Sequence, residues 1–318
     1  MKHIRTIFLT FLTVVLAVTV SACRKSEDSA AETSTEHAAE DVMNFATILH
    51  DAKSLNYESY YYTKNLQKFR QTRKYGFAMF GRQGSILFEP QTYLEKFYRE
   101  WSDYDESKGD KDNIDEKLLR VTEPYYFWFR LLQYSPSKGT IYVRYKDDRR
   151  ELGWKTTAEW SKSLEGIYEE KDPEVGHSDA FYKLCETFAD QFTRAEDEQF
   201  VFLDFKGNAT DNYDVVSAFR STFLDSGLFE TEKDSITSID LQIHLVLEKM
   251  ENGEFKLVPS EVNISIDTQY DNKETKTKMS TVDNFQLYIS GINQVNEIVA
   301  PDPVKQLMTC LLYTSDAA

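Results

Sequence analysis

Cys185 is a cysteine in the interior of this chain, and a thiol of this kind could act as a nucleophile. It lies in the segment DAFYKLCETFADQF, where Phe181, Leu184 and Phe188 recur at the spacing of one helical face. Burial among phenylalanines disfavours the thiolate, and no histidine stands at a spacing that suggests a catalytic partner. We therefore expect a helix that packs Cys185 into its apolar face, with no catalytic role for the thiol.

The acidic stretch SDYDESKGDKDNIDEK, residues 102–117, alternates Asp103 and Asp105 as a calcium-binding loop would. Lys108 occupies the position of the turn glycine and Ile114 that of the bidentate glutamate, so a solvated loop is expected instead. The sequence also lacks a His-Glu-x-x-His motif, a glycine-rich phosphate loop, a Gly-x-Ser-x-Gly elbow and a cysteine pair. We expect no catalytic residue, no metal site and no cofactor.

The amino-terminal segment has the composition of an export signal. A basic start precedes an apolar run at 7–20, which is too short to be read as a membrane-spanning helix. The junction Val-Ser-Ala-Cys that ends at Cys23 resembles the lipobox of bacterial lipoproteins, in which the cysteine is acylated and becomes the first residue. The resemblance implies a signal peptide at 1–22 and a lipid on Cys23.

Residues 23–40 lack aromatic side chains and are rich in Ser, Ala, Thr and Glu, which predicts a flexible tether. A protein anchored in this way is expected in the cell envelope, either on the outer membrane facing the periplasm or at the cell surface. Its contact with the membrane is expected to be made by the amino-terminal lipid.

The carboxyl-terminal segment 310–318, CLLYTSDAA, matches the translation of a common sequencing adapter, and we expect it to be an artefact. Without it, and with Cys23 acylated, Cys185 is the remaining thiol, so no intramolecular disulfide is expected. The formal net charge of −16 argues against nucleic acid as a partner, because it would repel the phosphate backbone.

The region 41–168 predicts a leading helix and a β-rich domain. Apolar residues recur at helical spacing within 42–52, and the tyrosine-rich segment 56–69 is expected to extend that helix. Segment 75–90 has glycines beside short apolar runs, which is typical of strands joined by tight turns. The alternating pattern at 139–160, with Gly-Trp in its return, resembles the closing hairpin of bacterial SH3-like domains.

The segment 199–230 has the pattern of an apolar strand, a polar turn and a helix that ends at a Ser-Gly pair. In the turn, Asp204, Asn208, Thr210 and Asp211 are expected to hold the backbone, with Asp211 capping the helix. The succession resembles a superfamily of envelope lipoproteins that includes the penicillin-binding protein activators, the curli secretion lipoprotein and the amino-terminal domain of TolB. The residues that fit its motif, with one extra residue before the asparagine, are Asp204, Phe205, Asn208, Thr210, Ser226, Gly227 and Phe229.

This resemblance implies an α/β activator-like domain at 178–299, which the polar segment 169–178 separates from the β-rich domain. A long antiparallel hairpin is predicted at 236–268, with His244 on its polar side. A helix followed by such a hairpin is also typical of NTF2-like and cystatin-like α+β domains, so both interpretations stay open. The expected fold class is α+β with two domains.

The sequence therefore predicts function only in outline. We expect a non-catalytic binding or regulatory lipoprotein with a protein partner in the cell envelope, and the activator resemblance points to peptidoglycan synthesis. The alternative is a protein that binds cell-wall glycan or peptide, or an unrecognised hydrolase. Aromatic residues make up 14% of the chain, which favours the alternative where they are exposed, because aromatic rings can stack on sugars.

Overall fold

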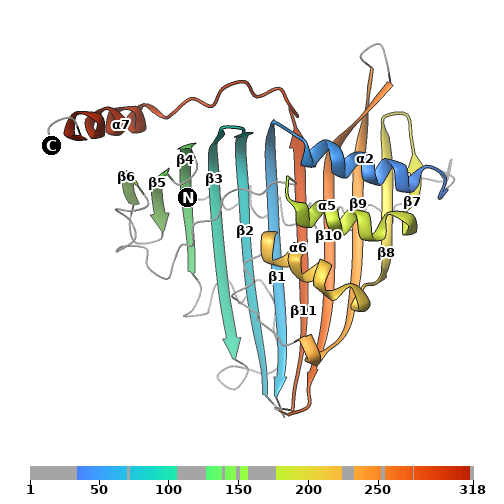
Figure 1. Cartoon of the computed structure of the whole chain (residues 1–318). Coiled ribbons are helices and arrows are strands. Elements are labelled where there is room, and N and C mark those ends of the chain that lie inside the picture. Colours follow the sequence, from blue (N-terminus) through green and yellow to red (C-terminus); the bar gives the residue numbers. More distant parts are fainter. Residues whose placement is uncertain are drawn as a thin grey trace. The chain divides into compact units, whose positions relative to one another are not determined.

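Among the residues that the structure describes, eleven strands form one antiparallel sheet in the computed structural model of this chain (Figure 1). The described residues belong to one compact unit, Ser34–Ala318. They are 34–69, 72–105, 127–137, 140–147, 151–156, 177–223, 233–251, 255–274 and 276–315.

The strand order is β6-β5-β4-β3-β2-β1-β11-β10-β9-β8-β7. The first strands in sequence are β1 (Ser54–Phe69), β2 (Thr72–Phe88), β3 (Gln91–Asp105), β4 (Phe127–Ser137), β5 (Thr140–Asp147) and β6 (Glu151–Thr156). The later strands are β7 (Thr193–Glu196), β8 (Phe200–Asn208), β9 (Ile236–Glu251), β10 (Phe255–Asn272) and β11 (Thr277–Ser290). Sequence neighbours are sheet neighbours, except that β6 and β7 form the two edges and β1 also pairs with β11.

The two-domain α+β fold predicted from the sequence is wrong. The two sets of strands, β1–β6 and β7–β11, join into one sheet through the pairing of β1 with β11, from Asn56 opposite Ser290 to Phe69 opposite Thr277. The hairpin at 139–160 is present as β5 and β6, but it is the edge of this sheet and not part of an SH3-like domain. In the part of the chain that the structure describes, neither a separate α/β domain nor the NTF2-like or cystatin-like alternative is formed.

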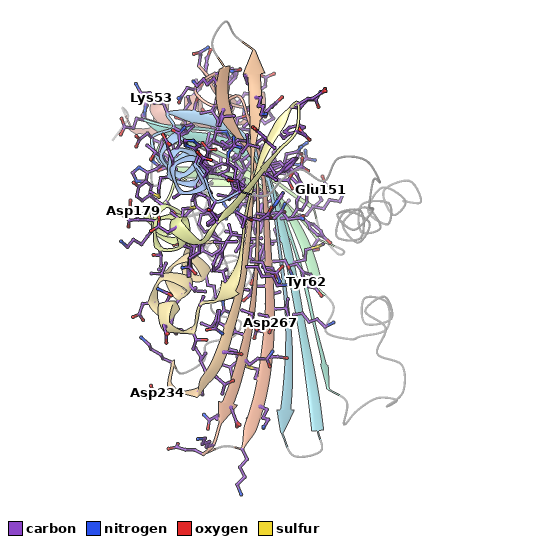
Figure 2. The ribbon with its side chains drawn as sticks, turned by 90° about the vertical axis from the view of Figure 1, so that its right-hand side faces the viewer. Lys53, Tyr62, Glu151, Asp179, Asp234 and Asp267 are labelled. Atoms are coloured by element: carbon purple, nitrogen blue, oxygen red, sulfur yellow. The ribbon has the colours of Figure 1, made fainter. Side chains whose placement is uncertain are left out.

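Helices cover one face of the sheet, and Figure 2 shows this layer beside the sheet seen nearly edge-on. They are α2 (Ala38–His50), α5 (Asp179–Phe188) and α6 (Tyr213–Phe223), and the helix predicted within 42–52 is thereby confirmed. The helix predicted over 179–192 is confirmed as far as Phe188, after which a 3-10 turn, Ala189–Gln191, follows. Aromatic rings join this layer to the sheet: Phe188 and Phe205 have centroids 4.7 Å apart, and Phe219 and Phe285 5.8 Å. These contacts anchor α5 on β8 and α6 on β11.

The strands alternate in burial, which defines an inner face under the helices and an outer face on the other side. The predicted hairpin is confirmed as β9 and β10, although its turn at 252–254 lies outside the described residues. As predicted, the alternating apolar residues of the hairpin are buried on the inner face, and His244 lies on the outer face. The inner residues are Leu241, Ile243, Leu245, Leu247, Val262, Ile264 and Ile266.

Two sequence interpretations of local structure are wrong. Segment 56–69 does not extend a helix but forms β1, in which Tyr57 and Tyr61 are buried on the inner face. Segment 75–90 holds most of a single strand, β2, and not strands joined by tight turns. Its Gly84 marks a close approach of β3, because a Cβ atom there would lie 2.4 Å from the carbonyl oxygen of Leu94.

The carboxyl-terminal part of the chain covers a portion of the outer face. After β11 the chain continues into α7 (Asp302–Ser315), whose Val304 is fully buried against Tyr134 of β4 and Tyr142 of β5. The segment 310–318, expected to be an artefact, forms the end of this helix as far as Ser315. The outer face of β4 and β5 is therefore part of a small second core.

Candidate functional site

Cys185 is fully buried in the middle of α5, among the phenylalanines that flank it in the sequence. Burial raises the pKa of its thiol far above the usual range, which leaves the nucleophilic thiolate essentially unpopulated. The position agrees with a packing role. Cys23 lies outside the described residues, so its acylation stays a prediction.

Replacing Cys185 with alanine is expected to cost about 1–2 kcal/mol of stability, because it leaves a small cavity in a packed helix face. Ligand binding below the lowered melting temperature should not change. Thermal melting and a binding assay on one preparation test this, and lost binding in a normally melting variant would contradict it.

The predicted turn after β8 is held by two of its residues. Asn208 Oδ1 accepts a hydrogen bond from the backbone N–H of Thr210 (3.1 Å), and Thr210 Oγ1 accepts one from the N–H of Ile239 (2.9 Å). These bonds close the turn and tie it to the start of β9. Among the described residues, the Asp211 carboxylate has no hydrogen-bond partner. Asp211 lies in a short 3-10 turn, Thr210–Asn212, so its side chain does not form the expected cap of α6.

Asp204 lies on the outer face of β8 and not in the turn. Its Oδ1 is 2.7 Å from Nδ1 of His244 on the neighbouring strand. The remaining motif residues, Ser226, Gly227 and Phe229, lie outside the described residues. The motif residues seen in the structure therefore support the local backbone and one histidine–carboxylate pair.

A second histidine–carboxylate pair joins two helices. His50 at the end of α2 contacts Asp51 through Nδ1 and Asp179 of α5 through Nε2, both at 3.0 Å. Hydrogen bonding to Asp51 and Asp179 raises the pKa of His50. Partial burial opposes the charged form of His244, but the hydrogen bond and charge of Asp204 outweigh it, so its pKa is raised too.

A histidine whose pKa is raised in the folded state stabilises the fold while its ring is protonated, because the charged ring interacts with the neighbouring carboxylate. This contribution is complete below the unfolded-state pKa of about 6.5 and is lost as the pH rises through the folded-state values. A His50→Gln/His244→Gln variant should therefore be less stable than the wild type at about pH 5.5, with a smaller difference at about pH 8.5. Urea denaturation at both pH values measures the difference in stability between the two proteins. A difference that grows with pH would contradict the stabilising role of the protonated histidines.

The inner face of β3 holds a buried carboxylate, Glu95, which is 1% exposed. It accepts hydrogen bonds from the Tyr57 hydroxyl (2.6 Å), Gln133 Nε2 (2.8 Å) and Arg82 Nη1 (3.4 Å). Burial and the adjacent Glu95 charge raise the pKa of Tyr57 well above its usual range, so it stays a proton donor. The carboxylate is enclosed by donors on three neighbouring strands.

A similar group lies where α6 crosses β11. Asp283, 2% exposed, accepts a hydrogen bond from the Tyr61 hydroxyl (2.6 Å) and forms an ion pair with Arg220 of α6 (2.9 Å). Arg220 also donates to the Tyr270 hydroxyl (3.3 Å). Both buried carboxylates are thus neutralised or hydrogen-bonded by neighbours, as burial of a charge requires. We interpret them as structural and not as catalytic groups.

The outer face carries an open pocket of about 510 Å³ across β11, β1, β2, β3 and β4, lined by described residues. Pockets of about 300–1,000 Å³ are the size that takes small molecules. The pocket lies on the side of the sheet that α2, α5 and α6 leave free. Side chains that line it on the outer face include Glu58, Gln83, Ser85, Leu94, Lys96 and Tyr288.

Strand register places the polar groups of this outer-face pocket in one row. Tyr288 of β11 lies opposite Glu58 of β1, which lies opposite Gln83 of β2, which lies opposite Lys96 of β3. The row extends beyond the pocket to Glu261 of β10. It therefore runs across the strands from an acidic and aromatic end to a basic end.

Several of the lining groups have partners within the protein. The Tyr60 hydroxyl donates to Glu58, and Ser85 Oγ donates to Asn56 Oδ1 (2.6 Å). Among the described residues, the side chains of Gln83, Lys96 and Tyr288 have no hydrogen-bond partner. These three are exposed, so they can contact a ligand.

Tyr288 is a large aromatic side chain in the lining of the outer-face pocket, and 37% of it is exposed. Partial burial and the charges of Glu261 and Glu58 raise its pKa, which keeps the hydroxyl protonated. An aromatic ring between two carboxylates makes a favourable place for a cation.

No residue of this pocket belongs to a functional motif that is recognisable in the sequence. The polar residues of the row lie far apart along the chain, and each looks like an ordinary solvent-exposed position of an alternating strand. The sequence does show a tyrosine or a charged residue at these positions. That these residues lie side by side is known only from the register of the strands.

No helix among the described residues is both long and apolar enough to span a membrane. Within the same part of the chain, no group of three or more His, Cys, Asp and Glu side chains could hold a metal ion.

No family model matches the chain, and no curated protein matches it in sequence. A solved structure to which it is similar, a crystal structure from Nitrosomonas europaea described as a candidate AttH, has a TM-score of 0.15 and 8% identity. The alignment covers 77% of this chain and 53% of that one, so the chain spans about half the length of that protein. A TM-score this low carries no argument about fold or function.

Proposed function

We propose that this chain is a lipid-anchored, non-catalytic binding protein of the cell envelope, and that the outer-face pocket is its ligand site. The observation that carries the proposal is that Gln83, Lys96 and Tyr288 line this pocket in one row across the strands, without hydrogen-bond partners among the described residues. A few polar groups that are placed in a pocket and left free to bind are a usual sign of ligand recognition. The resemblance of the junction at Cys23 to a lipobox supports the location.

The composition of the pocket favours binding over hydrolysis. Glycoside hydrolysis needs two carboxyl groups that flank the scissile bond. The outer-face lining holds one, Glu58, and the Tyr60 hydroxyl already donates to it. Glu95 contributes to the lining from β3, but its side chain is buried on the inner face.

A protein partner that acts in peptidoglycan synthesis fits this proposal as the recipient of a ligand-dependent signal.

The proposal is tested with a peptidoglycan digest, which offers both glycan fragments and stem peptides. We expect the purified lipidated protein to retain some components with unchanged mass. Ser85→Trp should fill the pocket and abolish retention, whereas Asp240→Trp, at an exposed outer-face position of β9, should not. New cleavage products that require the wild-type pocket would identify a hydrolase and contradict the proposal.

The anchor is tested separately at Cys23. Cells that express the wild type should incorporate a fatty-acid analogue into this protein, and a Cys23→Ala variant should not. The variant should also leave the membrane fraction. Equal labelling of both proteins would show that the lipobox assignment is wrong.

A further inference from the structure

We propose that the outer-face pocket binds a short peptide with a free amino end and a free carboxylate end, laid across the strands from Glu58 to Lys96. This inference rests on the function proposed above and deepens it by naming the ligand class. It depends on three features of the row: its charge polarity, its spacing and the neutral group at its centre.

The two ends of the row have opposite charge. Glu58, beside the exposed ring of Tyr288, offers a carboxylate and an aromatic face to an ammonium group. Glu261, opposite Tyr288 on its other side, adds a second negative charge. Lys96 at the far end is exposed and offers a point charge to a carboxylate. A neutral glycan would leave both ends without a counter-charge.

The spacing selects the length of the ligand. Glu58 and Lys96 are two strands apart, so their backbones are separated by about 10 Å at about 4.8 Å per strand. An extended chain advances about 3.3–3.6 Å per residue, so about three residues span this gap. A single amino acid is too short to reach both charges.

The centre of the row suits a peptide backbone. Gln83 lies between Glu58 and Lys96, and its amide can donate to a carbonyl and accept from an N–H at the same time. Leu94, in the neighbouring row, adds an apolar contact for a small side chain. The pocket thus offers a matched group at each point of a tripeptide.

The test measures binding of trialanine to the lipidated full chain in detergent by calorimetry. We expect N-acetyl-trialanine and trialanine amide each to bind about three- to tenfold more weakly, since each lacks one ionic end. Free alanine should bind more weakly than either. Glu58→Gln should remove the sensitivity to acetylation, and Lys96→Gln the sensitivity to amidation.

Charge-swap variants give a sharper outcome. Glu58→Lys alone and Lys96→Glu alone should each lose trialanine binding, and the double variant should regain it because the peptide can bind in the reverse direction. Asp240→Asn and Lys206→Gln, exposed outer-face positions on β9 and β8, are the matched controls and should not alter binding. Melting curves verify that each variant is folded.

The result that overturns this inference alone is pocket-dependent binding of chitotriose without binding of trialanine, since the proposed binding function would stand with a glycan as its ligand. The inference would also be overturned if trialanine, its N-acetyl form and its amide all bound with the same affinity. Failure to bind either probe or any component of the peptidoglycan digest would overturn the inference and the proposed function together.

Discussion

Replacing Asp283 with alanine is expected to lower the free energy of unfolding by about 3–5 kcal/mol, which would make it one of the most damaging single changes in the chain. Asp283 is buried and holds Arg220 and the Tyr61 hydroxyl. Its removal leaves a largely buried guanidinium without its counter-charge, and the desolvation cost of that group is no longer offset. Urea denaturation of the two proteins at neutral pH measures the difference.

The matched control is Asp267→Ala on β10. Asp267 is partly exposed on the outer face, where it accepts a hydrogen bond from Gln269 (2.7 Å), so its loss should cost below about 1 kcal/mol. An Arg220→Met/Asp283→Leu double variant should be more stable than Asp283→Ala, because neither partner is then left charged and buried. If Asp283→Ala and Asp267→Ala cost the same, the ion pair under α6 is not a stabilising element.

Local patterns in the sequence predict some of the helices and one long hairpin, because these elements depend on neighbours in the chain. Helical periodicity locates α2 and α5, and strict alternation locates β9 and β10. The tyrosine-rich segment 56–69 misleads because consecutive aromatics fill both faces of β1, which hides the period of two. Glycine in β2 misleads because it marks close strand packing at Gly84 and not a turn.

The assembly of these parts could not be predicted in the same way. Whether the strands form two domains or one sheet depends on the pairing of β1 with β11, and these strands lie near opposite ends of the chain. The predicted linker at 169–178 has the composition of a domain boundary, yet the strands on both sides of it belong to one sheet. The composition of a segment indicates that it can form an irregular connection. It does not indicate which strands on either side of that connection pair with each other.

The candidate site fails to show in the sequence for the same reason. Glu58, Gln83, Lys96 and Tyr288 come from four strands, and one residue of register shift in any of them would turn its side chain to the other face. The turn motif after β8 could be recognised in the sequence because its residues are adjacent in the chain, but its hydrogen bonds hold the backbone and do not form a site. A motif that is easy to recognise in this sequence is therefore not necessarily part of the ligand site.

Replacing Phe219 with alanine is expected to cost about 3–5 kcal/mol, since it empties the contact between α6 and the sheet. Phe219 is fully buried, and its ring centroid lies 4.8 Å from that of Phe223 and 5.8 Å from that of Phe285. The comparison variant, Phe202→Ala, removes an equal side chain from the outer face of β8, where it is partly exposed, and should cost much less.

The Phe219→Ala variant also separates the helix layer from the ligand site, because the pocket lies on the opposite face of the sheet. Trialanine binding measured well below the lowered melting temperature should therefore match that of the wild type. A variant that melts as expected but binds no peptide while folded would place the ligand under the helices on the inner face, and the outer-face assignment would be wrong.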